Sequence, residues 1–432
     1  MKNITVLISI LLISNCVLSQ NTDYESIKSS VINLGQVDNN NEDFDEFSKL
    51  DSVFHNVEIV MLGEQSHGEA TAYDTKVKLI KYLHQRLGFD LLVFESDFYA
   101  CNKAWQIVEE GGNVRDAMGR SIFQIWSTTK DLIPLADYIE ENHNSDTPLK
   151  LLGFDNQLTG KYSATHFIND LSAYLKTVKP SILDQTEWKH FSKSIELLTK
   201  YDFKGLKKNR PNNDLAFIQT IISELSKIRS DSESDFWLQT LRSIHSYLSD
   251  ISQKTDFRDK QMAENLIWLK EKYPNSKIIC WGATSHFLYN SEQVEMNSLA
   301  IQILGGNYYK KQPMMGEYIK EKFQEKVFTI GFTAYQGEYG LFRRGKIKVP
   351  KQGTLEFLLG QSEYDNFLLP LNHLNLDGYK SRPLGNYYMK NDIDEVMDAV
   401  IFNRNMRSPK LDRNFFLQIY PENKYIKPEI EE

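Results

Sequence analysis

Cysteine is scarce in this chain, with three residues among 432. One of them, Cys16, lies in an apolar N-terminal segment, so only Cys101 and Cys280 serve the rest of the chain. Two thiols exclude a disulfide scaffold and allow one bridge at most. We expect two separate buried thiols rather than a bridge.

The chain also lacks an excess of positive charge. Lysine and arginine number 50 against 58 aspartates and glutamates, which gives a formal net charge of −8. Proteins whose main partner is nucleic acid or an anionic membrane carry clustered basic residues. We therefore expect neither partner. After residue 20 no segment is long and apolar enough to cross a bilayer, so no transmembrane segment is expected.

The N-terminal segment "MKNITVLISILLISNCVLSQ" resembles an export signal, with a lysine, an apolar run over residues 4–13 and then small residues. The run is too short for a stable membrane span, and cleavage after Ser19 fits a small-residue site. The sequence therefore predicts an exported protein, periplasmic or secreted, that has lost residues 1–19. The alternative is a lipoprotein modified at Cys16, because residues 13–16 are similar to a lipobox.

Apolar runs of strand length alternate with helix-like patterns on both sides of a long middle section. Residues 162–273 in that section show helical patterns and no convincing strand. Alternating elements predict βαβ units with parallel strands. We therefore expect an α/β fold: a largely parallel sheet flanked by helices and interrupted by an all-helical insertion. The runs that predict strands cover residues 57–62, 90–94, 149–154, 277–282, 327–332, 367–370 and 398–402.

This organisation divides the chain into five segments. We expect a signal peptide (1–19), a polar N-terminal linker (20–50), a first α/β half (51–160), a helical insertion that serves as lid or pocket wall (161–275) and a second α/β half (276–432).

Polar residues follow four of the predicted strands directly. Glu64 and His67 follow the first strand, Glu95 the second, Asp155 the third and His286 the strand at 277–282. Ligands of open parallel sheets bind beyond the carboxyl ends of the strands. One such residue alone is typical of a helix cap, but repetition at four strand ends favours a functional site.

The residue types at these strand ends limit the chemistry. The sequence has no Gly-x-Ser-x-Gly elbow and no Walker or dinucleotide glycine pattern. A histidine can take a proton from water at neutral pH, and a carboxylate on its other nitrogen fixes the tautomer. This favours hydrolysis by activated water without a cofactor. A rival hypothesis is a metal-dependent hydrolase in which the same histidines and carboxylates hold zinc or another divalent ion.

Five segments in matching order resemble the erythromycin esterase family: "GEQSHGE", "GFDLLVFESD", "FRDKQMAENLIWL", "KIICWGATSHF" and "MMGEYIKEKFQEKVFTIGFTAYQGEY". Members of that family hydrolyse the ester of macrolide lactones, and some are linked to exopolysaccharide synthesis. The resemblance implies that His67 is the catalytic base, that Glu64 and Glu95 support it, and that His286 is a second active-site histidine. The sequence departs from the family's Trp-Ala-His-Asn-x-His pattern, because Ala283 occupies the first histidine position.

The resemblance also aligns Lys76 with an arginine of the family. Lysine keeps the positive charge but not the planar fork of arginine. We expect Lys76 and Asp155 to contact the substrate, a small-molecule ester or lactone. A third hypothesis, from another functional class, is a non-catalytic binding protein for envelope glycans or lipids. The sequence predicts no oligomeric state.

The export signal leads to a first prediction. Protein recovered from the envelope fraction should have lost most or all of residues 1–20, because signal peptidases remove such segments. Intact-mass measurement checks this, and an added lipid mass at Cys16 would support the lipoprotein alternative. A cytoplasmic chain that retains residues 1–20 would contradict the prediction.

Overall fold

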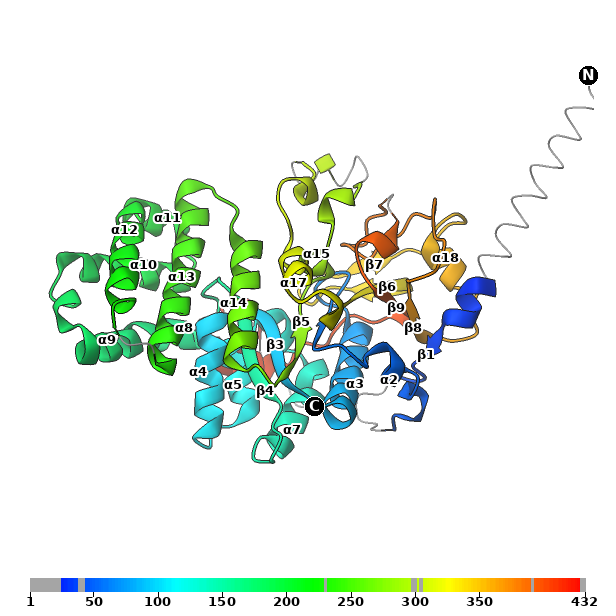
Figure 1. Cartoon of the computed structure of the whole chain (residues 1–432), viewed down its shortest axis with the longest axis horizontal. Helices are drawn as coiled ribbons and strands as arrows, with labels where there is room; N and C mark the ends of the chain where they lie inside the picture. Colours follow the sequence, from blue (N-terminus) through cyan, green and yellow to red (C-terminus); the bar gives the residue numbers. More distant parts are fainter. Residues whose placement is uncertain are drawn as a thin grey trace, which may run out of the picture.

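A mixed sheet of nine strands forms the centre of the described part of the chain in this computed structural model (Figure 1). The structure describes residues 25–37, 43–228, 231–296, 301–302, 306–389 and 392–427. The order is β1-β8-β9-β6-β2-β5-β3-β4, and β7 pairs with β6 outside this row. The strands are β1 (Ile32–Asn33), β2 (Ile59–Leu62), β3 (Phe89–Asp97), β4 (Lys150–Asp155), β5 (Lys277–Trp281), β6 (Val327–Tyr339), β7 (Gly345–Ile347), β8 (Asn366–Pro370) and β9 (Ala399–Met406).

The strands from β9 to β4 in this row are all parallel, whereas β1, β7 and β8 pair in antiparallel fashion. The predicted largely parallel sheet is therefore confirmed. Leu62 at the end of β2 pairs with Trp281 of β5 and with Ile330 of β6, and Trp281 also pairs with Phe94 of β3. This register brings the carboxyl ends of the central strands to one edge of the sheet.

Helices cover both faces of the sheet. Val60 and Leu62 of β2 pack in one apolar core with side chains of α3, α4, α5 and α7, whereas Ile59 and Met61 pack in another with side chains of the insertion. Burial on both faces explains why β2 is an unbroken apolar run, "IVML". The helices are α2 (Leu50–Val53), α3 (Ala70–Leu87), α4 (Phe98–Glu109), α5 (Val114–Ser121), α6 (Gln124–Ser127), α7 (Ile133–Asn142), α8 (Lys161–Thr165), α9 (Phe167–Val178), α10 (Thr186–Thr199), α11 (Phe203–Lys208), α12 (Asn212–Leu225), α13 (Ser232–Gln253), α14 (Arg258–Lys272), α15 (Thr284–Phe287), α17 (Met315–Phe323), α18 (Leu355–Leu359) and α19 (Arg413–Ile419).

The insertion between β4 and β5 contains helices α8 to α14 and, among its described residues, no strand. In Figure 1 these green helices extend to the left of the sheet, on the side of the edge strand β4. The last of them, α14, returns to the sheet and leads into β5. The all-helical insertion is therefore present, whereas its role as a lid or pocket wall stays a prediction.

The segment before β2 differs from the expected polar linker. Its described residues add β1 to the sheet beside β8, and Leu34 and Phe47 have no exposed surface. The apolar residues of this segment stand singly or in pairs among polar ones, so no periodic pattern marks them. Residues 1–24 lie outside the described ranges, and so do the predicted signal peptide and Cys16.

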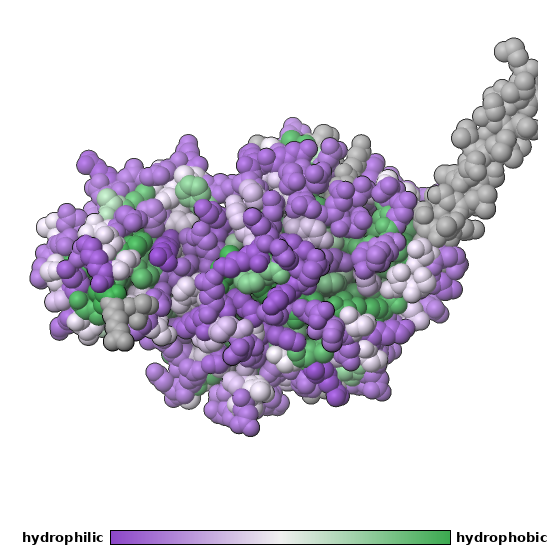
Figure 2. Space-filling view, viewed as in Figure 1, coloured by the Kyte–Doolittle hydropathy of each residue, from purple (hydrophilic) through white to green (hydrophobic). Residues whose placement is uncertain are grey.

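The face of the molecule in Figure 2 is mostly hydrophilic, with smaller hydrophobic patches among the hydrophilic residues. None of the helices in the described ranges is long and apolar enough to cross a membrane. Cys101 and Cys280 are both buried and free, as expected from the sequence.

The packing at the end of β2 leads to a second prediction. Gly63→Ala would place a Cβ 2.3 Å from Thr284 Oγ1 and 2.9 Å from the carbonyl oxygen of Ile330. Overpacking of this kind should lower the free energy of unfolding by about 1–3 kcal/mol. Urea unfolding measures the loss. Thr284→Ala in the same chain should restore part of it, because the nearest atom is then gone. An unchanged stability of the single variant would contradict this account.

Candidate active site

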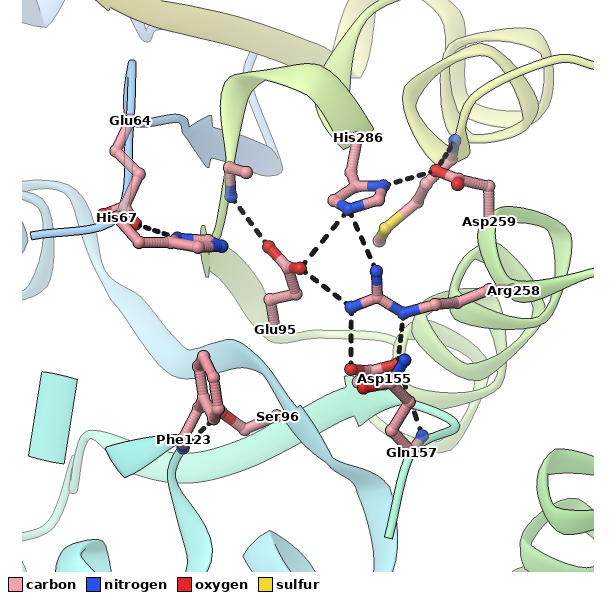
Figure 3. Close-up of polar contacts among 12 residues, drawn as sticks. Glu64, His67, Glu95, Ser96, Phe123, Asp155, Gln157, Arg258, Asp259 and His286 are labelled. Carbon is pink, nitrogen blue, oxygen red and sulfur yellow. Dashed lines mark hydrogen bonds and ion pairs between the residues drawn. The ribbon is translucent and has the colours of Figure 1, made fainter. Parts of the chain in front are cut away.

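Four strand ends bring their polar side chains together, as the sequence predicted. Figure 3 shows Glu64, Glu95, Asp155 and His286 facing one region beyond the carboxyl ends of β2, β3, β4 and β5, with His67 beside Glu64. The three carboxylates are buried, with Glu64, Glu95 and Asp155 at 1%, 6% and 4% exposed, and the side chain of His286 is 12% exposed. Buried ionisable groups need hydrogen-bond or charge partners, so the partners of each group describe the site.

Glu64 and His67 form a hydrogen-bonded pair on the turn that follows β2. His67 Nδ1 lies 2.6 Å from Glu64 Oε1. The turn depends on Gly68, whose φ is +92° and whose hypothetical Cβ would lie 2.7 Å from the Cα of Gly340. A side chain at this position would be strained and would also clash. The turn thus fixes the imidazole against the carboxylate.

Two further donors hold the Glu64 carboxylate. Lys76 Nζ donates to Oε2 at 3.1 Å, and the indole nitrogen of Trp126 donates to Oε1 and Oε2 at 3.0 and 3.3 Å. Lys76 and Trp126 have no exposed surface. The ammonium group of Lys76 thus faces the Glu64 carboxylate, and the expected contact of Lys76 with the substrate stays a prediction.

The second nitrogen of His67 faces away from Glu64, toward the region that contains Glu95 (Figure 3). The side chain of His67 is 37% exposed, so solvent reaches it. Burial lowers the pKa of His67, but the hydrogen bond and charge of Glu64, together with the charge of Glu95, outweigh it and raise the pKa above its usual value. With a proton on Nδ1, the neutral ring carries its lone pair on Nε2.

Glu95 lies at the centre of the group. Its Oε2 accepts from the backbone N–H of Ala283 at 2.8 Å, and its Oε1 accepts from Arg258 Nη2 at 2.9 Å. Burial raises the pKa of Glu95, but the charges of the two histidines and of Arg258 outweigh it and bring the pKa to about 2. Glu95 is therefore ionised at neutral pH.

Arg258 connects three of the strand ends. It donates from Nε and Nη2 to the two oxygens of Asp155 at 3.0 and 2.9 Å, and it lies 3.2 Å from His286 Nε2. Such a two-point contact is the strong form of the arginine–carboxylate pair. Asp155 Oδ1 also accepts from the backbone N–H of Gln157 at 3.4 Å, and the expected contact of Asp155 with the substrate stays a prediction. Arg258 belongs to α14, so the helical insertion supplies the cation of the site.

His286 has a carboxylate partner of its own, Asp259. Its Nδ1 lies 2.8 Å from Asp259 Oδ1, and Asp259 also accepts from the Tyr308 hydroxyl at 2.9 Å and from the backbone N–H of Met315 at 3.1 Å. Burial lowers the pKa of His286, but the charges of Asp259 and Glu95 outweigh it and raise the pKa. When neutral, Nε2 accepts from Arg258; when protonated, Nε2 can donate to Glu95, whose Oε1 is 3.4 Å away.

Sequence reasoning missed Trp126, Arg258 and Asp259. Arg258 and Asp259 stand in the segment "FRDKQMAENLIWL" that carried the family resemblance, which is the one signal that pointed to them. They lie about a hundred residues after Asp155 on the insertion, away from any strand end. Trp126 lies in a short helix between two strands and carries no motif.

The carboxylates of the site face cations of the chain. Glu64 contacts Lys76, and both Glu95 and Asp155 contact Arg258. The described residues contain no group of three or more histidine, cysteine, aspartate or glutamate side chains arranged to hold a metal ion. The prediction that the enzyme needs no cofactor stays a prediction.

Comparison with known proteins now adds to the geometry. A family model described as Erythromycin esterase matches residues 84–406, which is more than half of the chain. The chain belongs to the erythromycin esterase family. This confirms the resemblance inferred from the sequence and assigns the protein to a family of hydrolases.

Individual relatives share 30% or less of their residues with this chain. "Putative hydrolase YbfO" of Bacillus subtilis (strain 168) is 30% identical over 312 residues, 67% of each chain. "Erythromycin esterase type II" of Escherichia coli is 20% identical over 413 residues, which cover 83% of this chain and 92% of the relative. A solved structure of an erythromycin esterase mutant, EreC in its open conformation, has a TM-score of 0.64 at 15% identity and covers 86% of this chain and 96% of its own. At that identity the structure shows a shared fold.

The Arg258 network leads to a third prediction. Arg258→Met leaves Glu95 and Asp155 without their cation, which should cost about 3–5 kcal/mol of unfolding free energy at pH 7. The folded pKa of Glu95, about 2, lies below its ordinary value of 4.5. In the wild type its ionised form therefore adds stability above about pH 4.5, and this contribution is lost as the pH falls toward 2.

Of the charges that lower the pKa of Glu95, only those of the two histidines remain in Arg258→Met, so its ionised form is less stable and protonation at lower pH removes part of the penalty. The penalty relative to wild type should be largest at pH 7 and smaller at pH 4, as measured by urea unfolding at both values. Lys260→Met is the matched control, since Lys260 lies on the same helix with a side chain 58% exposed, and it should change stability by less than about 0.5 kcal/mol. An equal penalty at both pH values would refute the charge argument.

Proposed function

We propose that this protein is an exported enzyme that hydrolyses a carboxylic ester or lactone with a water molecule activated by His67. The observation that supports the proposal most is the Glu64–His67 pair: the carboxylate binds Nδ1 at 2.6 Å, and the other ring nitrogen faces the remaining charged groups. A base held in this way takes a proton at Nε2 and keeps its orientation while charged.

In the proposed reaction His67 Nε2 takes a proton from water as the water oxygen attacks the ester carbonyl carbon. The new C–O bond forms, and the carbonyl electrons move to the oxygen of a tetrahedral intermediate. The intermediate collapses when the bond to the alcohol oxygen breaks, and the alkoxide receives a proton. The products are a carboxylic acid and an alcohol, and a lactone gives both groups in one molecule.

His286 has a complementary role in this proposal. Its raised pKa, which Asp259 and Glu95 cause, keeps a larger share of the imidazole protonated near neutral pH. The imidazolium can stabilise the oxyanion or protonate the leaving alkoxide. Glu95 contacts both Arg258 and His286, so we assign it to the orientation of the charged groups beside His67.

Lys76 and Asp155 become positioning residues in this proposal rather than substrate contacts. Burial lowers the pKa of Lys76, while the adjacent Glu64 works in the opposite direction, so the two charges stabilise one another. Lys76 thereby supports the carboxylate that orients His67. Asp155 holds the guanidinium of Arg258 by two hydrogen bonds and fixes it beside His286.

The substrate class follows from the family and from the predicted export. The Escherichia coli relative is named an erythromycin esterase, and we propose macrolide lactones as the first substrates to test. The export segment would place the enzyme outside the cytoplasm, where such compounds arrive from other cells. Ala283 stands where the family pattern has a histidine, so a panel of other lactones and aryl esters belongs in the same experiment.

The experiment uses purified protein without its first 19 residues, incubated with erythromycin, a set of simpler lactones and aryl acetates. Mass spectrometry should show a lactone product heavier by one water and no acyl group on the protein. The same assay after chelation, and again after addition of Zn²⁺, tests the metal hypothesis. If chelation abolished the activity and Zn²⁺ restored it, the metal-dependent mechanism would replace the one proposed. Absence of hydrolysis across the panel, with binding of an envelope glycan or lipid, would favour the binding-protein hypothesis.

The proposed roles lead to a fourth prediction. His67→Asn keeps a similar size but cannot accept a proton at neutral pH, so activity should fall by about 10²- to 10⁴-fold. His286→Asn should cost about 10²- to 10³-fold if its role is to stabilise charge. Thermal unfolding beside the wild type shows whether each variant is folded. A folded His67→Asn variant with wild-type turnover would eliminate His67 as the base.

A further inference from the structure

Trp126 is a buried residue that contacts both members of the Glu64–His67 pair. Its ring centroid lies 5.4 Å from that of His67 with an angle of 85° between the planes, and its indole N–H donates to both oxygens of Glu64. It belongs to α6, a helix of four residues. The residue before this helix, Phe123, donates its backbone N–H to Ser96 Oγ at 3.0 Å, which ties α6 to β3 beside Glu95.

We propose that Trp126 is a positioning residue of the reaction: its indole N–H shares the Glu64 oxygen that binds His67 and so limits how strongly Glu64 holds the imidazolium. The inference rests on the proposed function, since it concerns the base of that reaction. It assigns a role to a residue that neither the sequence motifs nor the family comparison singled out.

The first step of the argument is the acceptor geometry. Glu64 Oε1 accepts from His67 Nδ1 at 2.6 Å and from the Trp126 indole at 3.0 Å, while Oε2 accepts from Lys76. With Glu64 only 1% exposed, water contributes little to its solvation. Each donor therefore takes up a share of the carboxylate charge. Removal of the indole N–H would leave more of that charge for His67.

The second step concerns the other charges around His67. The charge of Glu95 raises the pKa of His67 and that of His286 lowers it, whereas Lys76 donates to Glu64 rather than to His67. Glu69 is fully buried, and burial together with the charge of Glu64 raises its pKa to about 8, so it is mainly neutral at pH 7. Glu64 is the one carboxylate bonded directly to His67 among the described residues, so donors to Glu64 have the strongest effect on its protonation.

A second buried tryptophan, Trp281, provides a control that distinguishes the hydrogen bond of Trp126 from the packing of its ring. Trp281, at the end of β5, has no exposed surface, and its indole nitrogen has no hydrogen-bond partner among the described residues. Its ring lies 6.5 Å from that of Trp126, and Lys76 Nζ lies 4.4 Å from its ring centroid. The interior thus accepts an indole without a bonded N–H at one position, while at the other the N–H faces the carboxylate. Phenylalanine at residue 281 would keep an aromatic face for Lys76.

The test compares Trp126→Phe with Trp281→Phe. The pKa of His67 is measured by NMR titration of ¹³C-labelled histidine, with the resonance assigned by its absence in His67→Asn. Trp126→Phe should raise the pKa of His67 by roughly half a unit to one unit, because part of a hydrogen bond to a charged group is lost. Trp281→Phe should leave it within about 0.2 unit of wild type, well below that shift.

The acid limb of the kcat/KM profile should move upward by the same amount in Trp126→Phe, which lowers activity below the pKa by about three- to tenfold. A merely structural role would lower activity at every pH without moving the limb. Benzothienylalanine at residue 126 keeps the shape of the indole with sulfur in place of N–H, and it should give the same pKa shift even if phenylalanine disturbs folding.

An unchanged His67 pKa in the benzothienylalanine protein, or an equal shift in Trp281→Phe, would overturn the inference. The NMR titration needs no substrate, so it is independent of the proposed function. A protein with the expected pKa shift but no ester hydrolysis would leave the role of Trp126 beside His67 intact and refute the esterase proposal instead.

Discussion

The contact of Arg258 with Asp155, Glu95 and His286 is the interaction on which the rest of the site depends. Each of these partners stands at the end of a different strand, and Arg258 itself belongs to the first turn of α14 in the insertion. Buried carboxylates are costly unless a cation and hydrogen bonds compensate them. The same guanidinium therefore makes the charged strand ends possible and fixes α14 against the sheet. Separation of the insertion from the sheet would leave two buried carboxylates unpaired.

A second balance of charge holds on the β2 side of the site. Glu64 contacts the ammonium group of Lys76 and one imidazole that gains or loses a proton during the proposed reaction. The nearby Glu69 is raised to a pKa of about 8 by burial and by the charge of Glu64, so a second full negative charge is avoided. The site thus concentrates ionised groups, but each carboxylate has a defined partner.

The sequence predicted the parts of the site that follow from local pattern. Glu64, Glu95, Asp155 and His286 follow strands, and parallel strands bring their carboxyl ends to one edge whatever their order in the sheet. This logic does not extend to Arg258, which lies on a helix about a hundred residues after Asp155. Its position depends on how the insertion packs against the sheet. Many apolar side chains together determine that packing.

Two other differences have the same origin. The segment that contains β1 buries Leu34 and Phe47, yet its few apolar residues among polar ones carry no period from which a strand could be inferred. Lys76 carries the charge that the family resemblance suggested, but the sequence gives no information on which side of Glu64 it lies. In the structure Lys76 has no exposed surface and donates to Glu64, which is why the proposed function gives it a positioning role.

The two histidines are built alike, and exposure distinguishes them. Each has a carboxylate on Nδ1, and each of these carboxylates accepts from two further donors: Lys76 and Trp126 for Glu64, Tyr308 and a backbone N–H for Asp259. The side chain of His67 is 37% exposed, whereas that of His286 is 12% exposed and lies within 3.4 Å of Glu95. A base that activates water needs access to water, and a proton donor that stabilises charge works best where water is excluded. This difference in exposure supports the proposal that His67 is the base and His286 the charged acid, because the two carboxylate pairs alone would serve either role.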